Sequence, residues 1–282
     1  MNFGGIEEQY TLYDQSPVVM IPVPFDATST WIRGADRGPE AILEASANME
    51  LYDIQTNSEV YQNGIHTTDP VGATTDPVKM VADVEAEVMR VLKDGKFPVV
   101  IGGNHSVCIG PIRACARVYD RITVLQLDAH TDLRQEYEGT PLSHASVMAR
   151  AQEVANVVQV GIRSMCVEEV PFVQEGKIFY AHEIVGRSDW YDQVASVIEG
   201  PVYLTIDLDV FDPSVLPSTG TPEPGGLNYY EVYRFVKYIT ERFTIIGMDV
   251  NELCPVPGEK SSDFLASKLI YQIISLLNKK LS

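Results

Sequence analysis

The stretch "LDAHTDLR" (residues 127–134) follows a mainly apolar run at 122–127 and places Asp128, His130 and Asp132 at every second position. The apolar run predicts a buried β-strand. Side chains two residues apart in a strand lie on the same face, so these three would converge on one point. Two carboxylates and an imidazole in that arrangement indicate a metal site.

Similar apolar runs recur along the chain, at residues 17–25, 97–103, 121–130, 157–163, 177–181, 202–210 and 244–250. Several are apolar on both faces, which is typical of parallel strands covered by helices on each side. Helical patterns lie between the runs, at 77–94, 227–241 and 261–280, with Asp76 and Asp263 as expected caps. The alternation predicts a doubly wound α/β protein, and we expect a single domain over residues 1–282.

The composition excludes several classes of protein. Thirty-nine acidic residues against 21 basic ones give a formal charge of −18, which argues against a nucleic-acid partner and favours cationic ligands. No apolar stretch is long enough for a membrane span, which needs roughly 18 residues. The four cysteines show no zinc-finger spacing and there is no signal peptide, so we expect reduced thiols and a cytoplasmic location.

Three of the apolar runs end in titratable side chains. One run ends at His105, the second at Asp128, His130 and Asp132, and the third at Asp207 and Asp209. Ligands of open α/β sheets bind beyond the carboxyl ends of the strands, so parallel strands would bring all six side chains to one edge. Taken singly, each segment also fits a solvated loop, an Asp-rich turn or, for "IGGNHS", an anion-binding nest. Taken together, buried charges at three strand ends favour a metal site.

The six side chains are too many for one four-coordinate zinc ion. Oxygen and nitrogen ligands without thiolate favour Mn²⁺, and they are also compatible with iron, cobalt and nickel ions. Two ions about 3.5–4 Å apart would use all six residues and would lower the pKa of bound water enough to supply a nucleophile. The sequence therefore predicts metal-assisted hydrolysis.

The motifs "GGNHS", "DAHTD", "SHAS", "DLDVFDPS", "TGTPEPGG" and "DVNELCP", in this order and spacing, resemble the ureohydrolase (arginase/agmatinase) family. The opening "PFDATSTWIRGADRGPEAI" is similar too, so the resemblance covers nearly the whole chain. It implies a three-layer α/β/α sandwich, the arginase-like fold, with two Mn²⁺ per subunit. One ion would be held by His105, Asp128, Asp132 and Asp207. The other would be held by His130, Asp128, Asp207 and Asp209.

The same resemblance implies catalytic roles. Asp132 would also orient the attacking hydroxide, Glu252 in "DVNE" would pair with the substrate guanidinium, and His144 in "SHAS" would carry a proton to the leaving amine. Asn104 departs from the acidic residue that many relatives carry before the first histidine ligand. "SHAS" departs from the more frequent "HG" pairing after the histidine that carries the proton.

The segment after "DAHTD" indicates the substrate. It reads "LRQEYEG", lacks the Ser/Asn-rich pattern of arginases and looks like the agmatinase branch. Glu136 and Glu138 would favour a substrate tail that ends in ammonium. We therefore predict hydrolysis of agmatine to putrescine and urea. Aminopropylagmatine, arginine or guanidinobutyrate stay open as substrates.

Two alternative interpretations of the sequence are a deacetylase-like amidohydrolase with one zinc ion and a relative without catalytic activity. Both His105 and His130 are present, and this complete pair of metal positions argues against both interpretations. The family commonly forms trimers or hexamers. The segment 261–280 is apolar on most sides, which predicts burial against the sheet or a neighbouring subunit.

Overall fold

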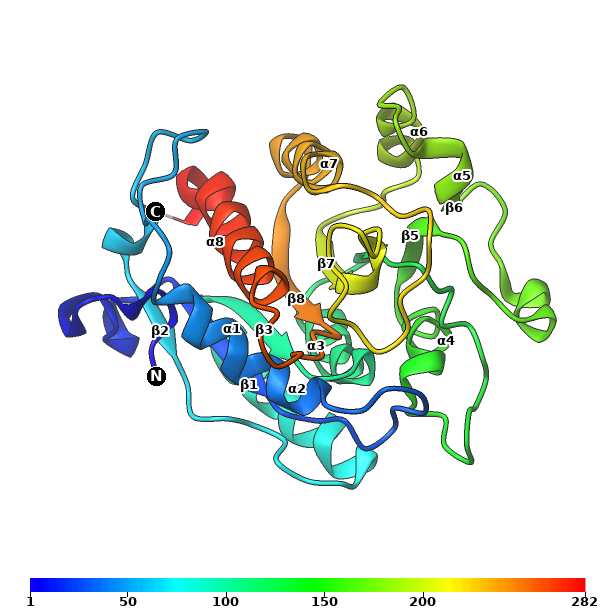
Figure 1. The fold of residues 1–282 in the computed structure, drawn as a ribbon, viewed down its shortest axis with the longest axis horizontal. Coiled ribbons are helices and arrows are strands. Elements are labelled where there is room, and N and C mark those ends of the chain that lie inside the picture. Colours follow the sequence, from blue (N-terminus) through cyan, green and yellow to red (C-terminus); the bar gives the residue numbers. More distant parts are fainter. Residues whose placement is uncertain (282) are drawn as a thin grey trace.

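The computed structural model describes the backbone of residues 1–281 and the side chains of residues 1–278. Within them, eight strands form one sheet in the order β2-β1-β3-β8-β7-β4-β5-β6, and every neighbouring pair is parallel (Figure 1). The strands are β1 (Val18–Val23), β2 (Ile65–Thr67), β3 (Phe97–Gly102), β4 (Thr123–Leu127), β5 (Asn156–Ile162), β6 (Ile178–Tyr180), β7 (Val202–Asp207) and β8 (Ile245–Asn251).

Helices cover both faces of this sheet, because its strands are apolar on both sides. One face packs against α1 (Gly38–Ser46), α7 (Tyr229–Arg242) and α8 (Ser261–Leu281), the face toward the viewer in Figure 1. The other face packs against α2 (Pro77–Lys93), α3 (Ile109–Val118) and α4 (Val147–Ala151). Two short helices, α5 (Ala181–Ile184) and α6 (Tyr191–Ser196), lie near β6 and α7. The predicted three-layer sandwich is confirmed.

The predicted helices form close to their expected bounds. In α2 the Asp76 side chain accepts a hydrogen bond from the Val78 N–H, and the next residue is proline at the first helical position. Helix α7 starts after Asn228, which forms a reciprocal capping box with Glu231.

The prediction of Asp263 as the cap of α8 is wrong. The helix begins at Ser261, and Glu259 accepts the N–H groups of Ser261 and Ser262. Asp263 lies inside the first turn and pairs with Lys260. The helix is buried within its own chain, where Ser267 donates a hydrogen bond to the carbonyl of Ile42 in α1.

The strand explanation for "DAHTD" is also wrong. Strand β4 ends at Leu127, so Asp128, His130 and Asp132 lie on the loop that follows it. The loop turns through Asp132, which has a φ of 52°, a conformation that non-glycine residues rarely adopt. The three side chains therefore meet because of the loop's path and not because of strand alternation.

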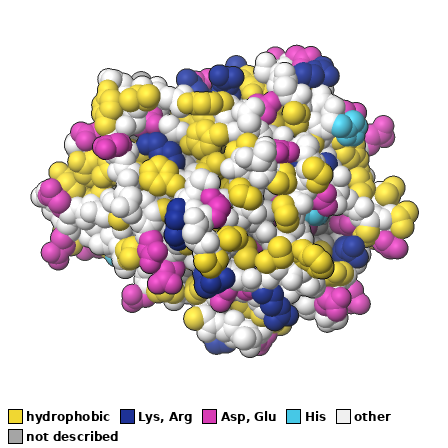
Figure 2. Space-filling model, in the orientation of Figure 1, with side chains coloured by type: hydrophobic (Ala, Val, Ile, Leu, Met, Phe, Trp, Pro, Cys, Tyr) yellow, Lys and Arg dark blue, Asp and Glu magenta, His cyan; other side chains and the backbone are white. Residues whose placement is uncertain are grey.

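The surface agrees with the acidic composition. On the face in Figure 2, acidic side chains are spread among apolar and basic ones and do not gather in one patch. None of the helices within residues 1–281 is long and apolar enough to cross a bilayer. All four cysteines carry free thiols.

Candidate metal centre

The predicted site residues meet at the carboxyl ends of four adjacent strands in the middle of the sheet, β3, β8, β7 and β4. His105 begins the turn after β3, Asp128 follows β4, and Asp207 is the last residue of β7. Glu252 follows β8 directly. The sheet thus delivers side chains from distant parts of the sequence to one edge, as open parallel sheets do.

His105 is the centre of a first group of possible metal ligands. Its Nδ1 atom lies 3.0 Å from Oδ2 of Asp128 and 3.0 Å from Oδ2 of Asp132. Oδ2 of Asp207 lies 3.4 Å from the same nitrogen. All four residues are buried. Three carboxylates therefore surround one imidazole nitrogen in a place shielded from solvent.

His130 is the centre of a second group. Its Nδ1 atom lies 2.8 Å from Oδ2 of Asp209 and 3.7 Å from Oδ1 of Asp128. Asp128 therefore faces His105 with one oxygen and His130 with the other. The ligand atoms of His105, Asp128 and Asp132 lie within 4.8 Å of one another, and so do those of Asp128, His130 and Asp209. A carboxylate shared in this way is suited to bridge two cations.

The loop that carries Asp132 is fixed by buried hydrogen bonds. The carbonyl of Asp132 accepts the N–H groups of Met148 and Ala149 at the start of α4. Oε1 of Glu169 accepts from the Thr131 hydroxyl at 2.7 Å and from the Leu133 N–H at 2.8 Å. These bonds compensate for the unusual backbone of Asp132 and hold its side chain toward His105.

The electrostatics of the site favour positive charge there. Burial, followed by the charges of Asp209 and Asp128, raises the pKa of Asp207 well above its usual value. Burial and the charge of Asp128 raise the pKa of Asp132 to about 7. Carboxylates crowded in a buried space are costly unless cations accompany them. The donor set, oxygen and imidazole nitrogen only, fits divalent metal ions of the manganese type.

Glu252 is held beside the first group. Its φ is 69°, and its Oε1 atom accepts the backbone N–H of His105 at 2.7 Å. Burial is the largest cause that raises its pKa, to about 8, and the charges of Asp209 and Asp26 add to it. A cationic ligand beside Glu252 would favour the ionised carboxylate.

His144 lies across the same cavity. Its ring makes an edge-on contact with Tyr137, with ring centroids 5.7 Å apart. Burial is the largest cause that lowers its pKa, to about 4, and the nearby imidazoles of His130 and His105 add to it. The imidazole is therefore neutral near pH 7.

These side chains line a cavity of about 270 Å³. Its lining includes His105, His130, Asp132, Arg134, Tyr137, His144, Cys166, Asp207, Asp209 and Glu252. A second hollow of about 450 Å³ adjoins it and shares Thr30 and Tyr137. Glu138 lines this second hollow. Glu136 is exposed and, within the described residues, lines neither space.

Asn104 lies outside the two ligand groups and has a structural role. Its amide nitrogen donates to the hydroxyls of Thr28 at 2.7 Å and Ser29 at 3.1 Å. Its carbonyl oxygen accepts from Ser106. Asn104 thus ties the loop around residue 28, which lines the second hollow, to the turn that carries His105.

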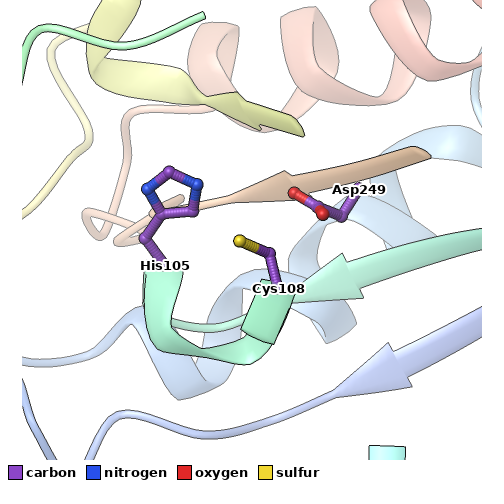
Figure 3. Close-up of side chains that lie close together, drawn as sticks. All are labelled: His105, Cys108 and Asp249. Carbon is purple, nitrogen blue, oxygen red and sulfur yellow. The ribbon is translucent and has the colours of Figure 1, made fainter. Parts of the chain in front are cut away.

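The structure also brings together three residues that sequence reasoning missed. Cys108 and Asp249 offer ligand atoms within 4.8 Å of one another and of His105 (Figure 3). The third residue is Thr205, whose hydroxyl oxygen lies 2.8 Å from Nε2 of His105. Burial raises the pKa of the Cys108 thiol to about 11, so the sulfur stays protonated and is a poor metal ligand. The one sequence signal for Thr205 and Asp249, a polar residue inside an otherwise apolar strand, was not used in the prediction.

Comparisons with known proteins agree with this geometry. The chain matches the model of the Arginase family over residues 16–275. It is 38% identical to a protein of Synechocystis sp. named N(1)-aminopropylagmatine ureohydrolase, over 95% of this chain and 91% of the relative. It is 32% identical to a protein of Pyrococcus horikoshii named agmatinase, over 92% and 91% of the two chains.

A solved structure gives the same answer for the fold. The agmatine ureohydrolase of Thermoplasma volcanium superposes with a TM-score of 0.89 at 27% identity, and the match covers 99% of this chain and 97% of that one. The predictions of an arginase-like fold and of a ureohydrolase-type enzyme are thereby confirmed, and the chain belongs to the arginase family.

Proposed function

We propose that this chain is a binuclear manganese enzyme that hydrolyses the guanidinium group of a linear cationic guanidino amine to urea and an amine. One observation carries the proposal: Asp128 joins two groups of metal-ligand atoms, and Glu252 lies on the wall of the same cavity. The first ion would be held by His105, Asp128, Asp132 and Asp207. The second would be held by His130, Asp128, Asp207 and Asp209.

When bound, the two ions would lower the pKa of a water molecule and so supply a hydroxide nucleophile near neutral pH. The protein's own side chains then position the substrate. An ionised Glu252, held by the His105 N–H, presents a carboxylate to the planar guanidinium in a charge-assisted contact. Asp132 would orient the nucleophile. Neutral His144 would take up a proton and pass it to the leaving amine.

We propose N(1)-aminopropylagmatine as the preferred substrate, with agmatine second. Four relatives with 33–38% identity carry the name of the longer compound, and agmatinases follow at 32%. The two adjoining spaces support this order, because a tail that passes Tyr137 would enter the hollow lined by Glu138. A second ammonium group on the longer tail would meet that carboxylate.

The test is a comparison of kcat/KM for aminopropylagmatine, agmatine, arginine and guanidinobutyrate, measured as urea release with Mn²⁺ present. We expect the order just given, and loss of urea release after chelation. Glu138→Gln should lower kcat/KM for aminopropylagmatine more than for agmatine. Glu136→Gln is the matched control, because Glu136 lines neither space. A preference for arginine would refute the proposed substrate.

A metal count separates this proposal from the deacetylase-like alternative. Two ions per chain are expected here, and one zinc ion per chain would favour the alternative. By the resemblance to its family, we further propose that the enzyme is a cytoplasmic homo-oligomer, a trimer or hexamer, with a role in polyamine biosynthesis. The mass of the purified particle in solution tests the oligomeric state.

A further inference from the structure

The ring of His105 is held from behind by a chain of buried polar groups. While Nδ1 faces the carboxylates of the site, Nε2 lies 2.8 Å from the hydroxyl oxygen of Thr205 on β7. The Thr205 hydroxyl in turn donates to Oδ1 of Asp249 on β8 at 2.6 Å. Thr205 and Asp249 are direct neighbours in the parallel pairing of the two strands. The pairing of β7 with β8 therefore fixes the positions of Thr205 and Asp249 in this series of hydrogen bonds, which begins at His105.

The direction of these hydrogen bonds follows from the surroundings of Asp249. Tyr203 donates its hydroxyl to Oδ2 of Asp249 at 2.6 Å, and the amide of Asn251 donates to Oδ1. An ionised carboxylate only accepts, so the single hydroxyl proton of Thr205 points to Asp249. The oxygen of Thr205 is then left to accept a proton from Nε2 of His105. In the metal-free chain Nδ1 shares a proton with the carboxylate of Asp132. Once a metal ion replaces that proton, the lone pair of Nδ1 would face the ion held by Asp128 and its neighbours.

The three residues of this hydrogen-bonded series are shielded from water, and this shielding strengthens the hydrogen bonds between them. Thr205 and Asp249 have no exposed surface, and His105 is 1% exposed. Figure 3 shows the sulfur of Cys108 between the His105 ring and the Asp249 carboxylate. The Cys108 side chain also lies within hydrogen-bonding reach of His105 and of Thr205, so it belongs to the same buried cluster.

We propose that Asp249 is a positioning residue that acts through Thr205 on His105, and that it holds this imidazole with Nδ1 ready to bind the first metal ion. The inference rests on the proposed function, because it requires that His105 is a metal ligand. His130, the histidine proposed to bind the second ion, is held differently. Its Nε2 atom lies 3.7 Å from Oε1 of Glu223, and its side chain is 26% exposed. The two ions should therefore respond differently to changes at Thr205.

The test is a titration with Mn²⁺, in which electron paramagnetic resonance counts the free ion and gives the number and affinities of the sites. Thr205→Val removes the hydroxyl at nearly constant volume, and Thr205→Ser is the matched control that keeps it. We expect Thr205→Val to bind one of its two ions about 10–100-fold more weakly, the range for lost outer hydrogen bonds of metal ligands. Thr205→Ser and Tyr203→Phe, which leaves Thr205 paired with Asp249, should stay close to wild type.

Asp249→Asn is the second variant, for use if Thr205→Val does not fold. It removes the charge at constant size and should weaken the same ion. Wild-type affinities for both ions in folded Thr205→Val, or in Asp249→Asn, would overturn the inference while leaving the proposed function intact. Failure of the wild-type protein to bind two ions would instead refute the proposed function itself.

Discussion

Replacing Asp132 by asparagine should stabilise the metal-free protein at pH 8, although Asp132 is a proposed metal ligand. Asp132 is 7% exposed, and burial with the neighbouring charge of Asp128 raises its pKa from 3.8 to about 7. Between these values the folded, metal-free chain keeps a proton that the unfolded chain releases. Its stability therefore falls as the pH rises through this window, by about 4 kcal/mol for roughly three pKa units.

The variant has no such proton to lose, so in chelator its free energy of unfolding at pH 8 should exceed that of wild type by up to about 4 kcal/mol. Below pH 4 the difference should vanish. Added Mn²⁺ acts in the opposite direction, since each ion at 100 times its dissociation constant contributes about 2.7 kcal/mol to a chain that binds it. Wild type should gain more than the variant, which lacks one charged ligand.

Urea unfolding at several pH values, with chelator or with Mn²⁺, measures both effects. Asp189→Asn is the control, because the side chain of Asp189 is 65% exposed and lies on the surface beside Arg187. A metal-free variant that is less stable than wild type at pH 8, or a difference that does not depend on pH, would refute the reasoning. An equal gain from Mn²⁺ in both proteins would refute the role of Asp132 as a ligand.

Two further predictions concern substrate pairing and helix stability. Glu252→Gln keeps an acceptor for the His105 N–H but loses the charge, so kcat/KM should fall on the order of 100-fold, as for a lost bond of about 2–3 kcal/mol to a charged group; unchanged kcat/KM with both ions bound would contradict the pairing. Asp76→Ala should lower the free energy of unfolding by about 1 kcal/mol through the lost cap of α2, whereas Asp76→Asn keeps the acceptor and should not.

Much of the fold was predictable because the strands are apolar on both faces and end abruptly in charged residues. The run at 202–210 led correctly to β7, and its terminal Asp207 lies at the site. Strand β2 was missed because it has only three residues and lies at the edge of the sheet. The cap of α8 was misassigned because Glu259 reaches the helix start from outside the helical pattern.

The details of the site were less predictable, for physical reasons. The six proposed ligands come together, but three of them lie on the "DAHTD" loop. The path of this loop depends on Glu169, a residue far from it in the sequence. Thr205 and Asp249 were counted as ordinary members of apolar strands, because their partners come from other strands and turns. Pairings of this kind depend on strand order, which local patterns do not determine.

The two adjoining spaces at the sheet edge have a consequence for how such an enzyme could be modified. The proposed metal ligands and Glu252 follow directly from four central strands or lie on one buried loop. The second hollow is lined mainly by the segments around residues 27–33 and 137–140, together with Thr75 and Pro77 at the start of α2. Thr28 and Ser29, which hold Asn104, and Tyr137, which packs on His144, would have to be kept so that the hydrolytic machinery stays in place. Exchange of the other residues of those segments would change the length and charge of the accepted tail. The same scaffold could then be retargeted to other guanidino compounds by loop grafting alone.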